Sequence, residues 1–227
     1  MKLWDNKNST NQKIIEFTVG NDRSYDLHLI KYDIKASISH AKMLYKSNLL
    51  TEIECNKILV ILKKMLDEAN AGKLKIENEF EDMHSKIEFL LIKKLGDTGK
   101  KIHTARSRND QVLVSIQLYL INELTQIKKE VKSLFDLLII LAKKNKDAIM
   151  PGYTHMKAAM PSSFGLWFSA FAEILIDDII SLNSTIKIVN QNTLGSAAGY
   201  GTSFNIDRNF TTKDLNFLTL KYNSLAC

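Results

Sequence analysis

Two long stretches of this sequence repeat apolar residues at the spacing of an α-helix, and they constrain the fold more than any other feature. The first runs from Ile116 to Leu141 and the second from Phe164 to Val189, with apolar side chains stepping by three or four positions. The only prolines, Pro151 and Pro161, lie between the two stretches. We therefore predict two helices of about 30 residues, roughly 45 Å each, with the second beginning at the Pro161 turn.

Three shorter helices are expected nearer the N-terminus. Apolar residues recur at helical spacing over residues 26–47, and a capping box of Thr51 and Glu54 opens a second helix that ends near Gly72. A third helix covers about residues 80–95. The sequence thus predicts an all-α protein with an N-terminal helical domain, residues 1–105, and a bundle of long central helices, residues 106–227.

The two long helices carry more apolar residues than one shared seam can bury. The surplus positions include Val112, Ile139, Trp167 and Ile180. Because large apolar patches are rarely left in water, further helices from this chain or from a partner should cover them.

Charge and cysteine content limit the possible functions. The net charge of +6 comes mainly from lysine pairs inside helical stretches, which solvated helix faces explain better than a nucleic-acid stripe, although nucleic-acid binding stays open as an alternative. Cys55 and Cys227 are far apart, with no Cys or His at metal-ligand spacing, so neither a disulfide framework nor a zinc site is indicated. Residues 1–11 lack an apolar signal segment, and the cytoplasm is the expected location.

A polar stretch, residues 103–111, stands directly before the first long helix and reads HTARSRNDQ. As a plain helix entrance it needs one cap, which Ser107, Asn109 or Asp110 could supply. That interpretation leaves unexplained two of the chain's four arginines, an amide and a histidine. Guanidinium groups, hydroxyls and a helix N-terminus are what a carboxylate needs, so the stretch favours an anion site.

A second polar motif, PGYTH at residues 151–155, lies in the break between the long helices. Thr154 and His155 could simply satisfy backbone groups there, as a lone histidine usually does. However, both motifs lie at ends of long helices, where side chains from separate segments can converge, and histidine suits proton transfer near neutral pH. His155 is therefore a candidate general acid or base.

The loop at residues 194–201, LGSAAGYG, is rich in small residues. A phosphate-binding loop would need a strand before it and a helix after it. No strand is evident in the sequence, so we do not interpret the loop as a phosphate site.

These motifs resemble the argininosuccinate lyase family. HTARSRNDQ followed by PGYTH is similar to its first two signature regions, and the agreement covers essentially the whole chain. The TH pair is shared by the wider fumarase and aspartase superfamily, whereas SRNDQ points to argininosuccinate lyase. The other segments that carry the resemblance are Tyr32-Asp33-Ile34, Ser37, His40-Ala41-Lys42, Glu81-Asp82-Met83-His84, Leu95-Gly96-Asp97 and the loop from Leu194 to Gly199.

The resemblance implies a fumarase/aspartase-like fold whose long central helices assemble in a homotetramer, with active sites shared between subunits. It implies the elimination of fumarate from argininosuccinate to give arginine, the last step of arginine biosynthesis, with no metal and no organic cofactor. His155 would assist proton transfer. The residues that would hold the substrate or lie near it are Ser107, Arg108, Asn109, Thr154 and His84.

The chain departs from the family pattern at three places. Asp5-Asn6-Lys7 stands where the family usually has Gly-Gly-Arg-Phe, and Asp22 stands where it usually has a substrate-contacting serine. The third signature, GSSxMPxKxN, whose serine is the family's proton-abstracting base, is expected beyond Cys227, so the chain resembles the N-terminal half. The alternative function is therefore a catalytically inactive helical oligomerisation fragment.

Overall fold

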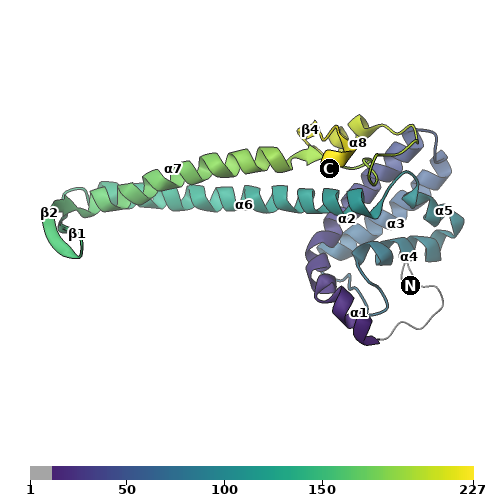
Figure 1. The fold of residues 1–227 in the computed structure, drawn as a ribbon, viewed down its shortest axis with the longest axis horizontal. Coiled ribbons are helices and arrows are strands. Elements are labelled where there is room, and N and C mark those ends of the chain that lie inside the picture. Colours follow the sequence, from purple (N-terminus) through teal and green to yellow (C-terminus); the bar gives the residue numbers. More distant parts are fainter. Residues whose placement is uncertain (1–11) are drawn as a thin grey trace. The chain divides into compact units, whose positions relative to one another are not determined.

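The computed structural model describes residues 12–227, which are mostly helical (Figure 1). They form two compact units. The first runs to Tyr119 and resumes at Asn190, and the second is the segment Leu120–Val189. The predicted departure at Asp5-Asn6-Lys7 lies outside the described residues.

The expected domains, residues 1–105 and 106–227, follow the order of the chain, whereas the compact units do not. The chain leaves the first unit within one long helix and returns to it near residue 190. The domain boundary after residue 105 therefore stays a prediction about the whole protein.

Three helices form the centre of the first unit: α2 (Asp22–Lys46), α3 (Glu52–Asn70) and α4 (Met83–Leu95). The predicted capping box of α3 is confirmed, because the Thr51 hydroxyl accepts the Glu54 N–H and the Glu54 carboxylate accepts the Thr51 N–H. The apolar faces of the three helices meet in one core, whose most buried members include Ile34, Leu44, Ile58, Leu62, Met83 and Leu91.

Short elements complete the first unit. Most follow the central helices in the chain, but α1 (Gln12–Val19), which precedes them, has no counterpart among the helices expected from the sequence. The remaining short elements are α5 (Asp97–Lys100), η1 (Lys101–His103), β3 (Gln191–Asn192), α8 (Arg208–Asp214), β4 (Thr219–Leu220) and η2 (Ser224–Ala226).

The prediction that no strand precedes the small-residue loop is wrong. Strand β3 ends at Asn192, one residue short of the loop, and pairs in parallel with β4. With two residues, β3 is too short to show the alternation that identifies a strand in sequence. The next helix, α8, begins only at Arg208, so the loop does not open directly into the helix that a phosphate-binding loop needs.

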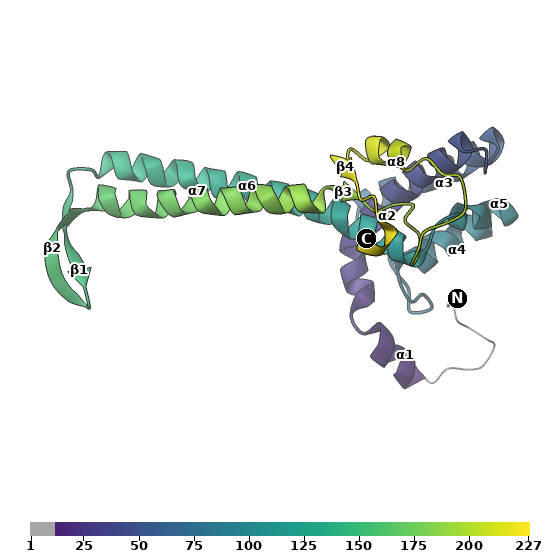
Figure 2. The same ribbon diagram turned by 45° about the horizontal axis from the view of Figure 1, so that its top comes forward.

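The second unit is a helix pair closed by a hairpin. It contains the part of α6 (Arg108–Lys144) that follows Tyr119, and α7 (Phe164–Val189) lies beside it (Figure 2). Both long helices were predicted. Gly165 lets them approach closely, since a Cβ added there would lie 2.9 Å from the Ala142 carbonyl oxygen of α6 and 2.6 Å from Cα of Lys146, just after that helix.

The start of α7 differs from the prediction. Strands β1 (Ile149–Thr154) and β2 (Lys157–Ser163) form an antiparallel hairpin between the helices, in which Pro161 is the partner of Pro151. Pro161 therefore belongs to a strand, and α7 begins at Phe164. Pro161 was interpreted as a helix-start residue and Pro151 as part of the break between the helices, but proline also fits a two-stranded ribbon, where each strand has a free edge.

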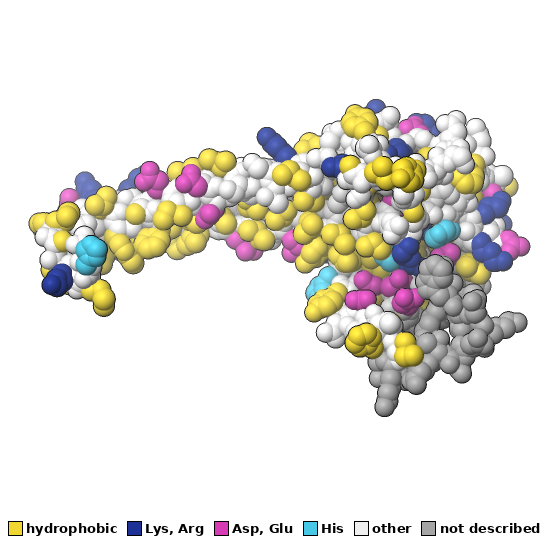
Figure 3. Space-filling model, viewed as in Figure 1, with side chains coloured by type: hydrophobic (Ala, Val, Ile, Leu, Met, Phe, Trp, Pro, Cys, Tyr) yellow, Lys and Arg dark blue, Asp and Glu magenta, His cyan; other side chains and the backbone are white. Residues whose placement is uncertain are grey.

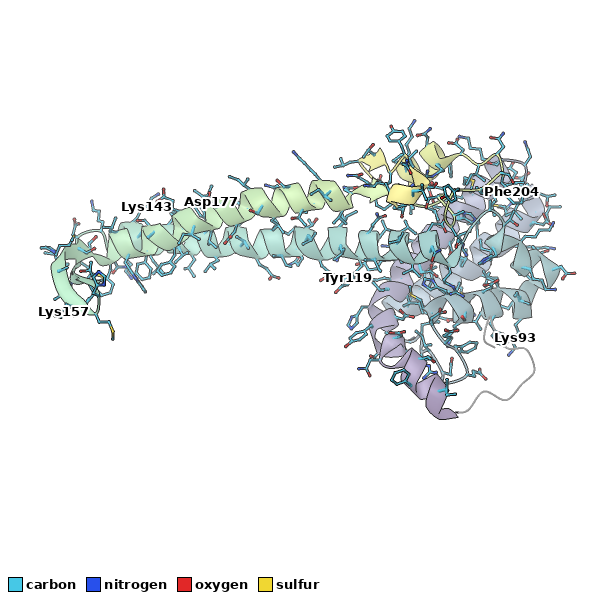
Figure 4. All side chains as sticks on the ribbon, viewed as in Figure 1. Lys93, Tyr119, Lys143, Lys157, Asp177 and Phe204 are labelled. Atoms are coloured by element: carbon cyan, nitrogen blue, oxygen red, sulfur yellow. The ribbon has the colours of Figure 1, made fainter. Side chains whose placement is uncertain are left out.

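Apolar side chains remain exposed along the helix pair (Figure 3). Of the four surplus positions predicted from the sequence, Val112 and Ile139 are only partly exposed, whereas the other two are exposed. Trp167 is 47% exposed and Ile180 is 59% exposed. Charged side chains such as Lys143 and Asp177 project from the same helices (Figure 4). A groove of about 480 Å³ crosses the pair, lined by residues that include Phe135, Leu175, Ile176 and Ile179.

Candidate active site

Ser107, the residue directly before α6, caps the first turn of this helix. The Ser107 hydroxyl accepts the Asn109 N–H over 3.2 Å, and the Asp110 carboxylate accepts the Ser107 N–H over 2.9 Å. This reciprocal pair satisfies two amides that a helix start leaves free. Of the three residues expected as possible caps, Ser107 accepts the Asn109 N–H, Asp110 accepts the Ser107 N–H, and the Asn109 side chain is exposed.

A pocket of about 460 Å³ opens beside this helix start. Arg108 and Asn109 line it from α6, and the loop residues 196–199 line it as well. A helix N-terminus carries partial positive charge, and guanidinium and amide groups donate hydrogen bonds that suit a carboxylate. The pocket lies where the HTARSRNDQ motif predicted an anion site, and anion binding there stays a prediction. The rest of its lining is Val112, Leu113, Ser224, Leu225 and Cys227.

Arg108 is held in place by α4. Its Nη1 donates a hydrogen bond to Asp82 Oδ1 over 3.0 Å, and its Nη2 lies 3.4 Å from Ser85 Oγ. Asp82 is also the N-cap of α4, accepting the Ser85 N–H over 2.7 Å. The guanidinium therefore reaches the pocket with a fixed orientation and with part of its charge compensated.

His84, also on α4, belongs to a buried polar cluster with residues of α2 and α6. Its Nδ1 lies 3.1 Å from Asp33 Oδ1, and Gln111 Nε2 donates to the same oxygen over 2.9 Å. Burial raises the pKa of Asp33, but His84, Arg106 and Gln111 outweigh this effect and hold that pKa below its usual value. His84 is not among the residues that line the pocket, and its place near the substrate stays a prediction.

Arg106 has a different position from Arg108. Its side chain is buried, Nη1 donates to Ser37 Oγ over 2.8 Å, and burial lowers the pKa of the guanidinium. His103 Nδ1 lies 3.7 Å from Glu88 Oε2. The HTARSRNDQ stretch is thus divided between the interior and the pocket, and only Arg108 of its two arginines lines the pocket.

Thr154 and His155 lie at the tip of the β1–β2 hairpin in the second unit. The turn consists of His155 and Met156, whose φ values are 47° and 62°. Two successive left-handed residues make the tightest hairpin turn, which usually contains Asn and Gly, so His and Met there store about 1–3 kcal/mol each. Both candidate side chains are exposed, and within residues 12–227 no hydrogen bond or ion pair holds them. Strain of this kind is typical of functional turns.

The predicted residues therefore fall into two groups. Ser107, Arg108 and Asn109 lie together at the start of α6, and His84 lies on α4, whose N-cap Asp82 binds Arg108. The other two, Thr154 and His155, belong to the second unit.

The structure adds residues that the sequence did not single out. Asp33 and Asp82 lie inside motifs quoted for the family resemblance, but nothing in those motifs showed their partners. Asp110 was considered only as a cap, although the Ser-x-x-Asp spacing is itself a sign of a capping box. The small-residue loop gave no sign that Ser196 would line a pocket.

Among the described residues, no group of three or more His, Cys, Asp or Glu side chains is arranged to hold a metal ion. Both cysteines are free, with Cys55 buried and Cys227 partly exposed. In the same part of the chain, every helix is too short or too polar to cross a membrane.

Comparison with known proteins identifies the family. A model described as lyase matches residues 10–226 of the chain. The chain belongs to this lyase family. It is 50% identical to the argininosuccinate lyase of Phocaeicola vulgatus over 222 residues, which cover 98% of this chain and 50% of that protein. The argininosuccinate lyase of Thermotoga neapolitana is 43% identical over 224 residues, covering 99% of this chain and 56% of that protein.

The predicted resemblance to argininosuccinate lyase is thus confirmed, and the chain spans about half the length of the curated relatives it matches. Solved structures of lyases confirm the all-α, fumarase/aspartase-like fold. An EDDS lyase variant with bound fumarate has a TM-score of 0.78 at 27% identity, over 87% of this chain and 38% of that one. The native fumarate lyase:delta crystallin of Brucella melitensis shares the fold at 15% identity, with a TM-score of 0.72 over 91% of this chain and 52% of that one.

Proposed function

We propose that the protein to which this chain contributes is an argininosuccinate lyase, a carbon–nitrogen lyase. It reversibly eliminates fumarate from 2-(Nω-L-arginino)succinate and releases L-arginine, the last step of arginine biosynthesis. The observation that carries the proposal is the 50% identity to an argininosuccinate lyase over 98% of the chain, together with a donor-lined pocket at the SRNDQ helix start. No metal and no organic cofactor take part in the proposed reaction.

The reaction needs groups that stabilise negative charge. A base removes a proton from the carbon next to a carboxylate, the electron pair forms the C=C bond of fumarate, and the C–N bond breaks as the leaving nitrogen takes a proton. The intermediate carbanion carries its charge into the neighbouring carboxylate, so fixed donors around that carboxylate lower the barrier. Amide, hydroxyl and guanidinium groups at a helix N-terminus supply such donors.

In the proposed site, Arg108 and Asn109 bind the succinate carboxylates at the pocket, and Ser107 presents its hydroxyl beside them. Arg108 and Asn109 line the pocket from the first turn of α6, and Ser107 directly precedes them, which supports this assignment. His84 lies close to the substrate, held by Asp33.

From the hairpin, Thr154 completes the substrate contacts and His155 assists proton transfer. Their exposure at a strained turn supports a role that is fulfilled only when another surface meets the hairpin. We propose that this surface belongs to another subunit, in a cytoplasmic homotetramer whose active sites are shared between chains. The exposed apolar residues of the helix pair support an assembly that buries them.

The alternative is a catalytically inactive helical fragment that only oligomerises. The apolar groove of the helix pair favours it, because association needs nothing beyond that surface. This alternative is favoured if the chain on its own forms oligomers but shows no turnover, and if His155→Asn leaves the oligomers unchanged.

A chimera separates these functions. This chain is joined to the part of the Phocaeicola vulgatus argininosuccinate lyase that it does not match, and both the chimera and the chain alone are incubated with argininosuccinate. The proposal predicts fumarate and arginine in equal amounts from the chimera, with turnover lowered by Asn109→Ala and unchanged by Asp97→Asn, an exposed control. A folded tetrameric chimera that releases neither product contradicts the proposal.

A further inference from the structure

Asp110 is fully buried and does not line the pocket, yet it joins two segments that do. Its Oδ1 accepts the Ser107 N–H over 2.9 Å, and its Oδ2 accepts the N–H groups of Gly195 and Ala197 over 2.9 and 3.0 Å. A buried carboxylate needs such donors, since it has lost its water. One side chain thus ties the start of α6 to Gly195, a loop residue that lies 85 residues later in the chain.

The loop is bent so that it meets this carboxylate. Gly195 has a φ of 87° and Ala197 a φ of 56°, both in the left-handed region. This conformation turns two amides, two residues apart, toward one oxygen atom, as in the backbone turns that bind anions. Ala197 adopts a conformation that alanine rarely takes, so an interaction must hold it there.

Arg208 fixes the same loop on a different set of atoms. Its Nε donates to Leu194 O over 3.2 Å, and its Nη2 donates to Lys221 O over 2.9 Å. A Cβ added to Gly195 would lie 2.9 Å from Arg208 Cγ and also from Ile206 Cδ1. The loop therefore has little room to shift toward Arg208, and the Asp110 carboxylate decides how it meets α6.

We infer that Asp110 is a positioning residue that holds loop residues 196–199 in register with Arg108 and Asn109 and thereby sets the shape of the anion pocket. Both oxygens of its carboxylate accept backbone hydrogen bonds, three in all. Asp110 therefore acts through the loop and does not touch the ligand. The inference rests on the proposed function, because it takes the pocket to bind a dicarboxylate. It extends that function by assigning a role to the aspartate of the SRNDQ run.

The test compares Asp110→Asn with the exposed control Asp97→Asn in the full 227-residue chain. Asparagine keeps one acceptor oxygen but presents an NH2 group where the second oxygen was, so it cannot accept from both segments. Amide hydrogen exchange reports the loop, and a fumarate titration reports the pocket. We expect exchange at Gly195 and Ala197 to accelerate at least about tenfold in Asp110→Asn. We also expect its fumarate Kd to rise at least about fivefold, with neither change in Asp97→Asn.

The outcomes are distinguishable. Faster loop exchange with an unchanged fumarate Kd makes Asp110 merely structural and overturns the inference, as does unchanged loop exchange. A wild-type chain that binds no fumarate, but whose loop exchange still depends on Asp110, counts against the proposed function and supports the placement of the loop. If Asp110→Asn does not fold, Asp110→Glu replaces it. That variant keeps the charge at the helix start but moves the carboxylate, and it should show the same two changes.

Discussion

Arg108 Nη1 donates a hydrogen bond to Asp82 Oδ1 over 3.0 Å, which links the first residue of α6 to the N-cap of α4. The same Asp82 oxygen accepts the Ser85 N–H, so one carboxylate both caps α4 and orients the guanidinium. Both side chains of the ion pair are 23% exposed, which leaves the arginine accessible to an anion. The candidate site is therefore built on two helix starts held together by a single carboxylate.

Substituting Asp82 should separate its two roles. Asp82→Asn keeps a good N-cap but removes the charge, so the free energy of unfolding should fall by less than about 1 kcal/mol for a partly exposed ion pair. Asp82→Ala also removes the cap and should cost about 1 kcal/mol more. Urea denaturation of the two variants measures this difference. Equal stability of the two would contradict the capping role.

The buried His40 should make stability depend on pH. Burial, followed by the charge of Arg106, lowers the pKa of His40 from 6.5 to about 3. The unfolded state therefore takes up a proton below pH 6.5 that the folded state refuses until about pH 3. The stabilisation is fully present above pH 6.5 and is lost as the pH falls, by up to about 1.4 kcal/mol per pH unit. His40→Asn should flatten this part of the unfolding profile, and an unchanged slope would contradict the assignment.

Even the substitution of Gly165 by alanine should destabilise the helix pair. In Gly165→Ala the new Cβ would meet Lys146 Cα at 2.6 Å and the Ala142 carbonyl oxygen at 2.9 Å, both backbone atoms that cannot move alone. We expect a loss of about 1–3 kcal/mol from overpacking. Ser169→Ala on the same helix removes only one hydrogen bond to Leu166 O and should cost less than about 1 kcal/mol. Thermal unfolding of both variants tests the contrast, and equal losses would show that the helix pair is not closely packed there.

His155 should matter for turnover but not for folding. Because its side chain is exposed, His155→Asn should leave the unfolding temperature unchanged, and asparagine also tolerates the left-handed conformation of the turn. In the chimera with the unmatched part of the Phocaeicola vulgatus relative, we expect the rate of fumarate release to fall about 100-fold or more, as for loss of a general acid or base. A fall of less than about threefold would remove His155 from the proton-transfer role.

The sequence predicted what depends on long periodic patterns. The two long helices, the capping box of Thr51 and Glu54, and the end of α4 near residue 95 all follow from local rules and appear in the structure. Short elements were missed. The hairpin around His155 has no Asn-Gly signal, and its prolines suggested a break instead of a strand pair.

The partners of the candidate residues could not be predicted. HTARSRNDQ indicated an anion site, but nothing local distinguishes Arg106, which turns into the core, from Arg108, which reaches the pocket. Likewise, Asp33 with His84 and Asp110 with Gly195 are pairs separated by 51 and 85 residues that only the folded chain brings together. The choice between core and pocket is made by tertiary packing, which a single sequence does not encode locally.

The most direct test of the central claim is a fumarate titration of the isotope-labelled chain followed by amide NMR. We predict concentration-dependent shifts at Ser107 to Asp110 and at loop residues 196–199, which Asn109→Ala weakens. Shifts confined to the apolar groove of the helix pair, or no shifts at any fumarate concentration up to tens of millimolar, would contradict a dicarboxylate site at the start of α6.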